Sequence, residues 1–272
     1  MSRCQDYNRQ NRLKFNPMMK QAAFTGLLLA GALVMILSGS CRKKTDDFQP
    51  EPLTDYFITL EPGKYIRYLL DSTLYIEFGQ RDTVISYEAK DVVDAPITDG
   101  LGRPGWRILR YLRPVGSTNE AAWEPRLTYF VFPEKSRLEV VENNLRFIKL
   151  YTPVKEGNSW HGNMHLPDHP YEQFYGILSD AGIQFWDYTY QDYGASEEIN
   201  NVVYDSVVTV LQVDEEDYSS TLDYKNYWVE KYAKGIGLVY KEVIMWEHQP
   251  AVGSNPDYMQ GFGIRLSILD HN

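Results

Sequence analysis

The sequence has little cysteine, no excess of positive charge and no recognisable catalytic motif. Two cysteines, Cys4 and Cys41, occur among 272 residues, so a disulfide-rich framework and a cysteine-based zinc site are both excluded. The formal net charge of −10 at pH 7 opposes binding to phosphate backbones, which depends on Lys and Arg, and we expect no nucleic-acid partner. The fold must therefore be stabilised by its hydrophobic core.

The missing catalytic motifs exclude several enzyme classes. The chain contains no G-x-S-x-G nucleophile motif, and "GIGLVYK" (235–241) matches neither a P-loop nor a dinucleotide fingerprint. Ser159 and His161 lie two positions apart, which places them on one face of a strand without implying contact. Acidic residues are so plentiful that no carboxylate pair stands out. We therefore expect a protein without catalytic activity and without a cofactor.

A long uncharged segment near the N-terminus has the layout of an export signal. Basic residues such as Arg9 and Lys20 precede it, and no charged residue occurs from Gln21 to Cys41. Residues 22–37 are rich in Leu and Ala, as in the apolar region of a signal peptide. An uncleaved membrane anchor is the alternative, but a span needs about 20 mainly apolar residues, and this segment is at the short edge of that range.

The end of this segment indicates lipid attachment. Small residues at 38–40 precede Cys41, and "LSGSC" resembles the signal peptidase II site of bacterial lipoproteins, although Ser38 stands where leucine is usual. The resemblance implies a signal peptide over residues 1–40 and lipidation of Cys41 as the new N-terminus. Two methionines, Met18 and Met19, stand where a shorter signal would begin, so the first 17 residues fit an over-extended start.

Residues 41–54 are predicted to form a polar tether behind the lipid. Without residues 1–40 the chain keeps 22 basic and 36 acidic residues, which suits solubility outside the cytoplasm. The stretch "KTDD" (44–47) resembles the surface-export tag of some Gram-negative lipoproteins, with one residue inserted. A solvated linker without any signal is the alternative. We expect an outer-membrane lipoprotein of the cell envelope, either periplasmic or surface-exposed. Its partner is the membrane, to which acyl chains such as palmitate anchor it.

The chain from residue 55 onward predicts strands. "KYIRYLLDSTLYIEFG" (64–79) alternates in two runs around Asp71 and Ser72, which predicts a hairpin that turns at those two residues. Asn143 and Asn144 separate two further short runs and tolerate left-handed turn geometry.

The second half of the chain continues this pattern. Residues 224–249 predict two long strands joined near 233–237, and Trp246 is in phase with Ile244, which predicts that it lies in the core. Residues 262–269 alternate as a last strand with one solvated side. We therefore predict an all-β domain over residues 55–272, built as a single large antiparallel sheet, curved or barrel-like, with long loops and little helix.

Both ends of this domain resemble exported β-rich lipoproteins of Gram-negative bacteria. The resemblance is carried by "YFITLEPG" (56–63) and "GIGLV" (235–239). The matching residues are Tyr56, Phe57, Leu60, Gly63, Gly235, Gly237, Leu238 and Val239. The resemblance implies one structural unit and no activity, and in some relatives a curved sheet like that of lipoprotein carriers.

A histidine cluster is the candidate metal site. In "HGNMHLPDHP" (161–170), His161, His165 and His169 are spaced by four, which on a helix would align them as ligands. Pro167 and Pro170 argue against a helix, because proline clashes with the preceding turn. A solvated loop is the alternative, and we expect no bound metal.

Aromatic residues suggest a ligand surface. The chain has 21 Tyr and 6 Trp, and Trp and Tyr side chains can stack on sugar rings. Trp123 and Trp160 lie in or beside polar loops, which predicts an exposed pair that binds a glycan. The leading prediction is a non-catalytic binding or structural accessory module that contacts a glycan or an envelope protein. The alternatives are a glycan-binding surface module and a carrier that holds an acyl chain or other apolar ligand in a curved sheet.

Overall fold

A computed structural model describes residues 52–56, 60–218 and 223–272. The predicted signal, the lipidation site at Cys41 and most of the tether lie outside the described residues. Within the described ranges, no helix is long and apolar enough to cross a membrane.

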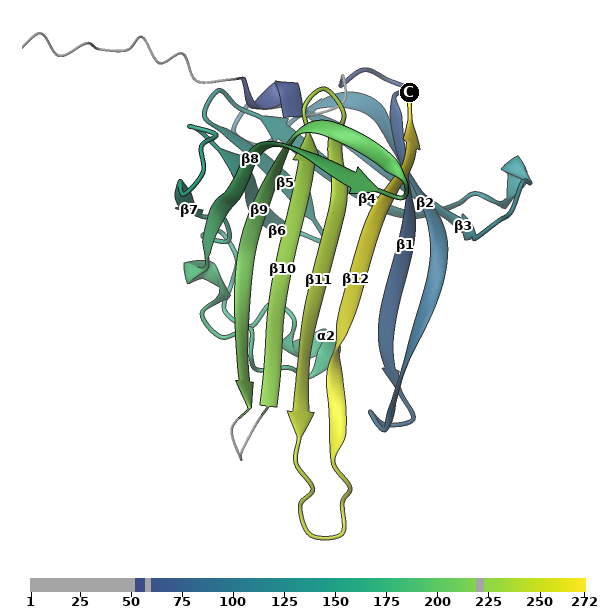
Figure 1. Cartoon of the computed structure of the whole chain (residues 1–272), viewed down its shortest axis with the longest axis vertical. Coiled ribbons are helices and arrows are strands. Elements are labelled where there is room, and N and C mark those ends of the chain that lie inside the picture. The colour runs from purple at the N-terminus through teal and green to yellow at the C-terminus, as the bar shows by residue number, and fades with distance from the viewer. Residues whose placement is uncertain (1–51, 57–59, 219–222) are drawn as a thin grey trace, which may run out of the picture. The chain divides into compact units, whose positions relative to one another are not determined.

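The described chain is built almost entirely from strands (Figure 1). Helical structure is limited to short turns: η1 (Leu53–Tyr56), η2 (Glu120–Ala122), α2 (Glu172–Tyr175) and η3 (Ile183–Phe185). The strands are β1 (Tyr65–Ile76), β2 (Arg81–Thr98), β3 (Pro104–Pro114), β4 (Glu124–Pro133), β5 (Arg137–Glu142), β6 (Leu145–Tyr151), β7 (Ser159–His161), β8 (Asp187–Ile199), β9 (Val202–Tyr218), β10 (Asp223–Ala233), β11 (Gly237–Gln249) and β12 (Tyr258–His271).

All these strands form one antiparallel sheet. Its order is β6-β5-β4-β3-β2-β1-β12-β11-β10-β9-β8-β7, so the first strand pairs with the last and every other neighbour follows in sequence. The sheet curls into a nearly closed barrel, which confirms the predicted all-β fold.

The two sheet edges meet at a seam beside β6 and β7. The Ile148 amide donates to the Gly162 carbonyl at 2.8 Å, and the Trp160 indole N–H donates to the Ile148 carbonyl, also at 2.8 Å. A side chain at Gly162 would lie 2.3 Å from the ring of Tyr188 on β8, so only glycine lets the chain after β7 pass this close to that ring.

Local turn chemistry explains most of the hairpins. Asn143 and Asn144 adopt positive φ angles of 52° and 62° between β5 and β6, as predicted. The predicted turn at Asp71 and Ser72 is wrong, because β1 runs through both residues and the chain turns after Ile76. Asp71 instead accepts hydrogen bonds across the sheet from neighbouring strands, so polarity there marks an outward-facing position rather than a turn.

The faces of β11 are also reversed from expectation. Val239, Val243 and Met245 are buried, whereas Trp246 lies on the opposite face, with its ring centroid 6.4 Å from that of Tyr218. The buried face therefore includes Lys241, which the alternation pattern places beside these apolar residues.

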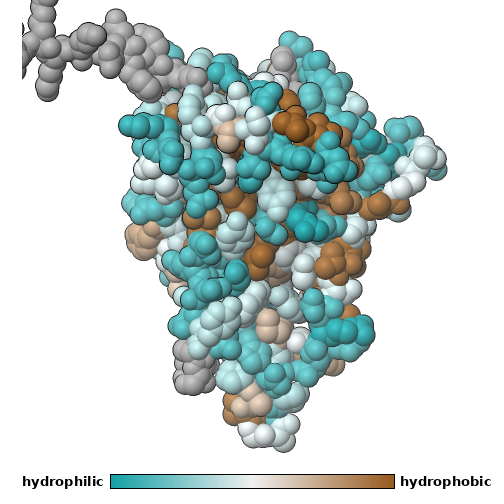
Figure 2. All heavy atoms as spheres, viewed as in Figure 1, coloured by the Kyte–Doolittle hydropathy of each residue, from teal (hydrophilic) through white to brown (hydrophobic). Residues whose placement is uncertain are grey.

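The surface seen in Figure 2 is largely hydrophilic, with hydrophobic residues scattered over it.

Candidate ligand-binding cavity

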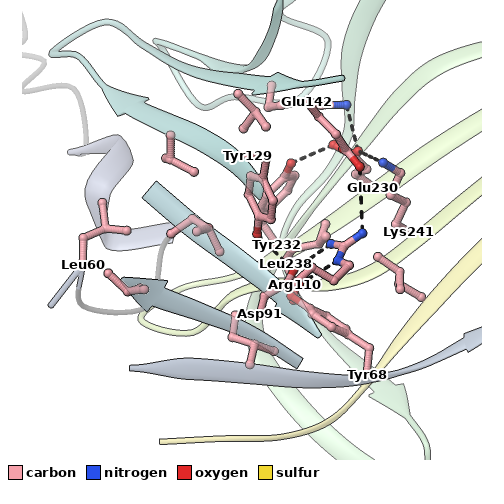
Figure 3. A pocket seen from close by; sticks show the side chains of 17 residues that line it. Leu60, Tyr68, Asp91, Arg110, Tyr129, Glu142, Glu230, Tyr232, Leu238 and Lys241 are labelled. Carbon is pink, nitrogen blue, oxygen red and sulfur yellow. Dashed lines mark hydrogen bonds and ion pairs between the residues drawn. The ribbon is translucent and has the colours of Figure 1, made fainter. Parts of the chain in front are cut away.

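A layer of charged side chains crosses the interior of the barrel (Figure 3). It is built from six strands, and each strand supplies one residue. The residues are Asp91 on β2, Arg110 on β3, Glu142 on β5, Lys149 on β6, Glu230 on β10 and Lys241 on β11. Charged groups are rarely buried unless they are paired, so the layer is an unusual feature of a small barrel.

Asp91 and Arg110 form a two-bond pair at one side of the layer. They lie opposite each other in the register of β2 and β3. Arg110 Nε donates to Asp91 Oδ1 at 2.6 Å, and Arg110 Nη2 donates to Oδ2 at 2.7 Å. The Tyr129 hydroxyl donates to Asp91 Oδ2 at 3.0 Å. This geometry orients the guanidinium and compensates its burial.

Lys149 and Glu230 form the second pair. Their Nζ and Oε1 atoms are 2.8 Å apart, and their side chains are only 6% and 3% exposed. The Tyr232 hydroxyl donates to Glu230 Oε2 at 2.7 Å. Burial by itself would raise the pKa of Glu230, but the ammonium groups of Lys149 and Lys241 outweigh it and lower that pKa to about 2.

Lys241 and Glu142 are held less tightly than the two pairs. Lys241 Nζ lies 3.6 Å from Glu230 Oε1, beyond a normal hydrogen bond, and no described residue accepts a hydrogen bond from it. Glu142 Oε1 lies 3.9 Å from Arg110 Nη1, its one ion pair among the described residues. Burial opposes the charge of Glu142, but Lys241, Arg110 and Lys149 together lower its pKa. Glu142 therefore stays ionised near neutral pH, and both side chains keep hydrogen-bonding capacity.

Two cavities lie against this layer. A small one of about 80 Å³ is lined by Tyr68, Asp91 and Glu230 together with apolar residues. A large one of about 1430 Å³ exceeds the range of about 300–1,000 Å³ typical of ligand pockets. Four charged residues line both cavities and so separate them: Arg110, Glu142, Lys149 and Lys241. Of the charged layer, the large cavity thus meets three cations and one carboxylate, while Asp91 and Glu230 lie behind them.

The rest of the large cavity is lined by aromatic and aliphatic residues and by five polar ones, Asn143, Asn144, His169, Glu172 and Gln173. Phe147, Trp228 and Phe262 line it from the strands, and Tyr171 and Tyr175 line it from α2 and the residue before it. The Tyr175 and Phe262 rings stack at 4.3 Å between centroids. Leu70, Leu145, Val243 and Ile264 add aliphatic surface from the strands, and Pro167, Pro170 and Phe174 add apolar surface from the segment around α2.

Buried carboxylates attach the segment around α2 to the barrel. Asp180, fully buried, accepts a hydrogen bond from the Tyr171 amide at 2.8 Å and contacts His169 Nδ1 at 2.9 Å. Glu247 on β11 accepts hydrogen bonds from the amides of Leu178 and Ser179. These contacts give the cavity a preformed wall rather than a loose loop.

The charges suit binding better than proton transfer. A hydrolase built on a carboxylate pair needs one carboxylic acid with a raised pKa. Glu142 and Glu230 both have lowered pKa values, so both are ionised near neutral pH. The cavity combines an apolar wall with a polar floor, which is the chemistry of a site for an amphipathic molecule.

The three candidate metal ligands do not converge. His161 pairs with Asp187 at 3.0 Å, His169 pairs with Asp180, and His165 is exposed. Among the residues that the structure describes, no group of three His, Cys, Asp or Glu side chains could hold a metal ion. Of the three histidines, His169 lines the large cavity.

The tryptophans predicted as an exposed pair are arranged differently. Trp160 is only 7% exposed, so the prediction of an exposed ring is wrong: its indole closes the seam and packs 4.7 Å from the Tyr190 ring. Trp123 is half-buried, with the Arg113 guanidinium 4.4 Å from its ring centroid. Neither residue lines the large cavity.

The sequence reasoning missed the charged layer. Its signal was present: Asp91, Arg110, Glu230 and Lys241 each interrupt an alternating apolar face, as Lys241 does between Val239 and Val243. In addition, Glu230 and Lys241 are opposite one another in the hairpin of β10 and β11. A charge at an inward position, facing an opposite charge across a hairpin, predicts a buried pair.

Comparison with known proteins assigns no family. No protein-family model matches the chain, and no curated protein sequence is significantly similar to it. Among solved structures, a Bacteroides fragilis protein described as exported and as having a YmcC-like fold aligns with 79% of this chain and 99% of its own. The identity is 9% and the TM-score 0.30, a likeness too low to establish a shared fold or function.

Proposed function

We propose that this protein is a non-catalytic binding module of the cell envelope that holds an amphipathic ligand in the large cavity of its barrel. The observation that carries the proposal is the cavity of about 1430 Å³ itself, with its aromatic wall and charged floor. Among the functions predicted from the sequence, this agrees best with a carrier of an acyl chain or similar apolar ligand.

The apolar wall supplies the driving force for such binding. Burying apolar surface is worth about 25 cal/mol per Å², and an acyl chain would cover Phe147, Trp228 and Phe262 as it leaves water. A glycan would stack on these rings and could pair some hydroxyl groups with Asn143, Asn144 and Gln173, but it would leave others against aliphatic residues such as Leu145 and Ile264. The wall therefore favours an apolar tail over a sugar chain.

The envelope location is proposed from the N-terminal sequence. Residues 22–41 resemble a lipoprotein signal that ends at Cys41, and the residues behind it are polar. A lipid-anchored barrel would hold its cavity near a membrane, where amphipathic ligands are concentrated. Periplasmic and surface-exposed positions both fit this proposal.

Two measurements test the binding function. Native mass spectrometry of residues 45–272, secreted by the producing host without the anchor, should show an added mass that denaturation releases. The apolar fluorophore N-phenyl-1-naphthylamine should also bind, and Leu145→Trp, which narrows the cavity, should weaken binding by about tenfold or more.

Val84→Trp is the matched control, because Val84 lies exposed on β2 and does not line the cavity. It should leave probe binding unchanged. A folded wild-type protein that carries no added mass and binds neither the fluorophore nor any acyl compound would refute the proposed function.

A further inference from the structure

We propose that the ligand carries a single carboxylate, that Lys241 binds this carboxylate at the cavity floor, and that Glu142 is the group it displaces. This inference rests on the proposed function and names the ligand class, an amphipathic monocarboxylate such as a fatty acid anion.

The argument begins with the cations that face the large cavity. Arg110 is already occupied by two hydrogen bonds to Asp91, and Lys149 by its pair with Glu230. Lys241 has three N–H donors, yet its described ion pair is a 3.6 Å contact with Glu230. Lys241 is therefore the cation in the floor none of whose donors makes a hydrogen bond to a described residue.

The charge of the layer determines how many charges the ligand can carry. Three cations face three carboxylates, and two of those carboxylates, Asp91 and Glu230, are bonded directly to Arg110 and Lys149. The third, Glu142, has its one described ion pair with Arg110 at 3.9 Å, and the charge of Lys241 lowers its pKa without an ion pair between the two. Removing Glu142 from the floor would leave an excess of one positive charge, which matches a monoanion rather than a dianionic phosphate.

Glu142 has the properties of a displaceable group. Its side chain is 24% exposed, and its one described ion pair is 3.9 Å long. It lies at the end of β5, immediately before the turn at Asn143 and Asn144, which also lines the cavity. A ligand carboxylate entering the floor would take over the favourable interaction with Lys241, while Glu142 rotates toward the open cavity.

A pair of probes of equal chain length tests the inference. Titration calorimetry should compare decanoate with 1-decanol, which share the apolar tail and differ in the head group. Wild type should bind decanoate more tightly. Glu142→Gln should strengthen decanoate binding by about tenfold, because it removes the competing negative charge, and should leave 1-decanol within about twofold.

Lys241→Met should have the opposite effect. It should weaken decanoate binding by about tenfold or more and spare 1-decanol, since the aliphatic stem is kept. Glu230 retains its 2.8 Å pair with Lys149, so we expect this variant to fold. Lys231→Met, on the same hairpin but paired with Glu197 and away from the cavity, is the control and should change neither affinity.

The outcomes separate the two proposals. Equal binding of both probes by wild type, unchanged in Glu142→Gln and Lys241→Met, would overturn the carboxylate assignment and leave the amphipathic cavity standing. Failure of both probes to bind folded wild type would overturn the carboxylate assignment too, and, together with the absence of an added mass and of fluorophore binding, it would refute the proposed function itself. Circular dichroism of each variant establishes folding, and Glu142→Gln alone decides the question if Lys241→Met does not fold.

Discussion

The buried pair of Lys149 and Glu230 should be a major determinant of stability, and Lys149→Met tests this directly. The substitution keeps the length and apolar character of the side chain but leaves Glu230 without its 2.8 Å partner. Breaking a buried ion pair from one side costs about 3–5 kcal/mol, because the remaining charge stays desolvated. Lys241 and Tyr232 remain near Glu230, so we expect a loss at the lower end of that range.

The pKa of Glu230 gives an independent magnitude. It is about 2 in the folded protein against 4.5 for an ordinary glutamate. A difference of roughly 2.5 pKa units, at about 1.36 kcal/mol each, corresponds to about 3 kcal/mol for the ionisation of Glu230, and burial, which lowers the pKa of Lys149, offsets part of this for the pair. Because the folded pKa is lowered, this contribution is complete above pH 4.5 and is lost as the pH falls toward 2.

Urea denaturation followed by tryptophan fluorescence measures both effects. Wild type should lose more stability between pH 6 and pH 3 than Lys149→Met, whose Glu230 has already lost most of its stabilisation. The double variant Lys149→Met/Glu230→Gln should recover part of the loss, since it removes the unpaired charge. A Lys149→Met protein within about 0.5 kcal/mol of wild type at pH 6, at equal m-value, would refute this reasoning.

Three further predictions concern the seam, the cavity rim and the anchor. Trp160→Phe removes the donor to the Ile148 carbonyl and should cost about 1–3 kcal/mol in the free energy of unfolding, measured in urea; an unchanged midpoint would contradict the seam's role. His169 should titrate above its usual pKa of 6.5 because Asp180 holds its proton, so its stabilisation is complete below pH 6.5 and lost as the pH rises through the raised value. Nuclear magnetic resonance titration should show this, and Asp180→Asn should return the pKa toward 6.5. Cys41→Ser should abolish the acyl mass on the full-length protein, while unchanged membrane extraction behaviour would argue against lipidation there.

Local sequence patterns predicted the strands because the alternation that defines a strand involves only residues that are neighbours in the sequence. The paired asparagines at 143 and 144 form the predicted turn, since both tolerate positive φ. The same local reasoning failed at Asp71, where a polar residue faces outward within a continuous strand. It also failed at Trp160, because Gly157 and Asn158, which suggested an exposed loop, pair with the backbone of Tyr190 on β8, and the indole beyond them is buried at the seam.

By itself, the sequence determined the all-β class, the antiparallel hairpins and the export-like N-terminal segment, because alternation, turn residues and charge-free runs are properties of contiguous chain. Only the tertiary structure decided which charges meet. Lys149 and Glu230 are separated by 81 positions and come together because the curled sheet brings β6 opposite β10. The cavity arises in the same way, since its floor and wall are assembled from strands that contribute one to three side chains each, together with the segment around α2. The site forms only when the barrel closes, which brings together residues far apart in the sequence at a cost in chain entropy.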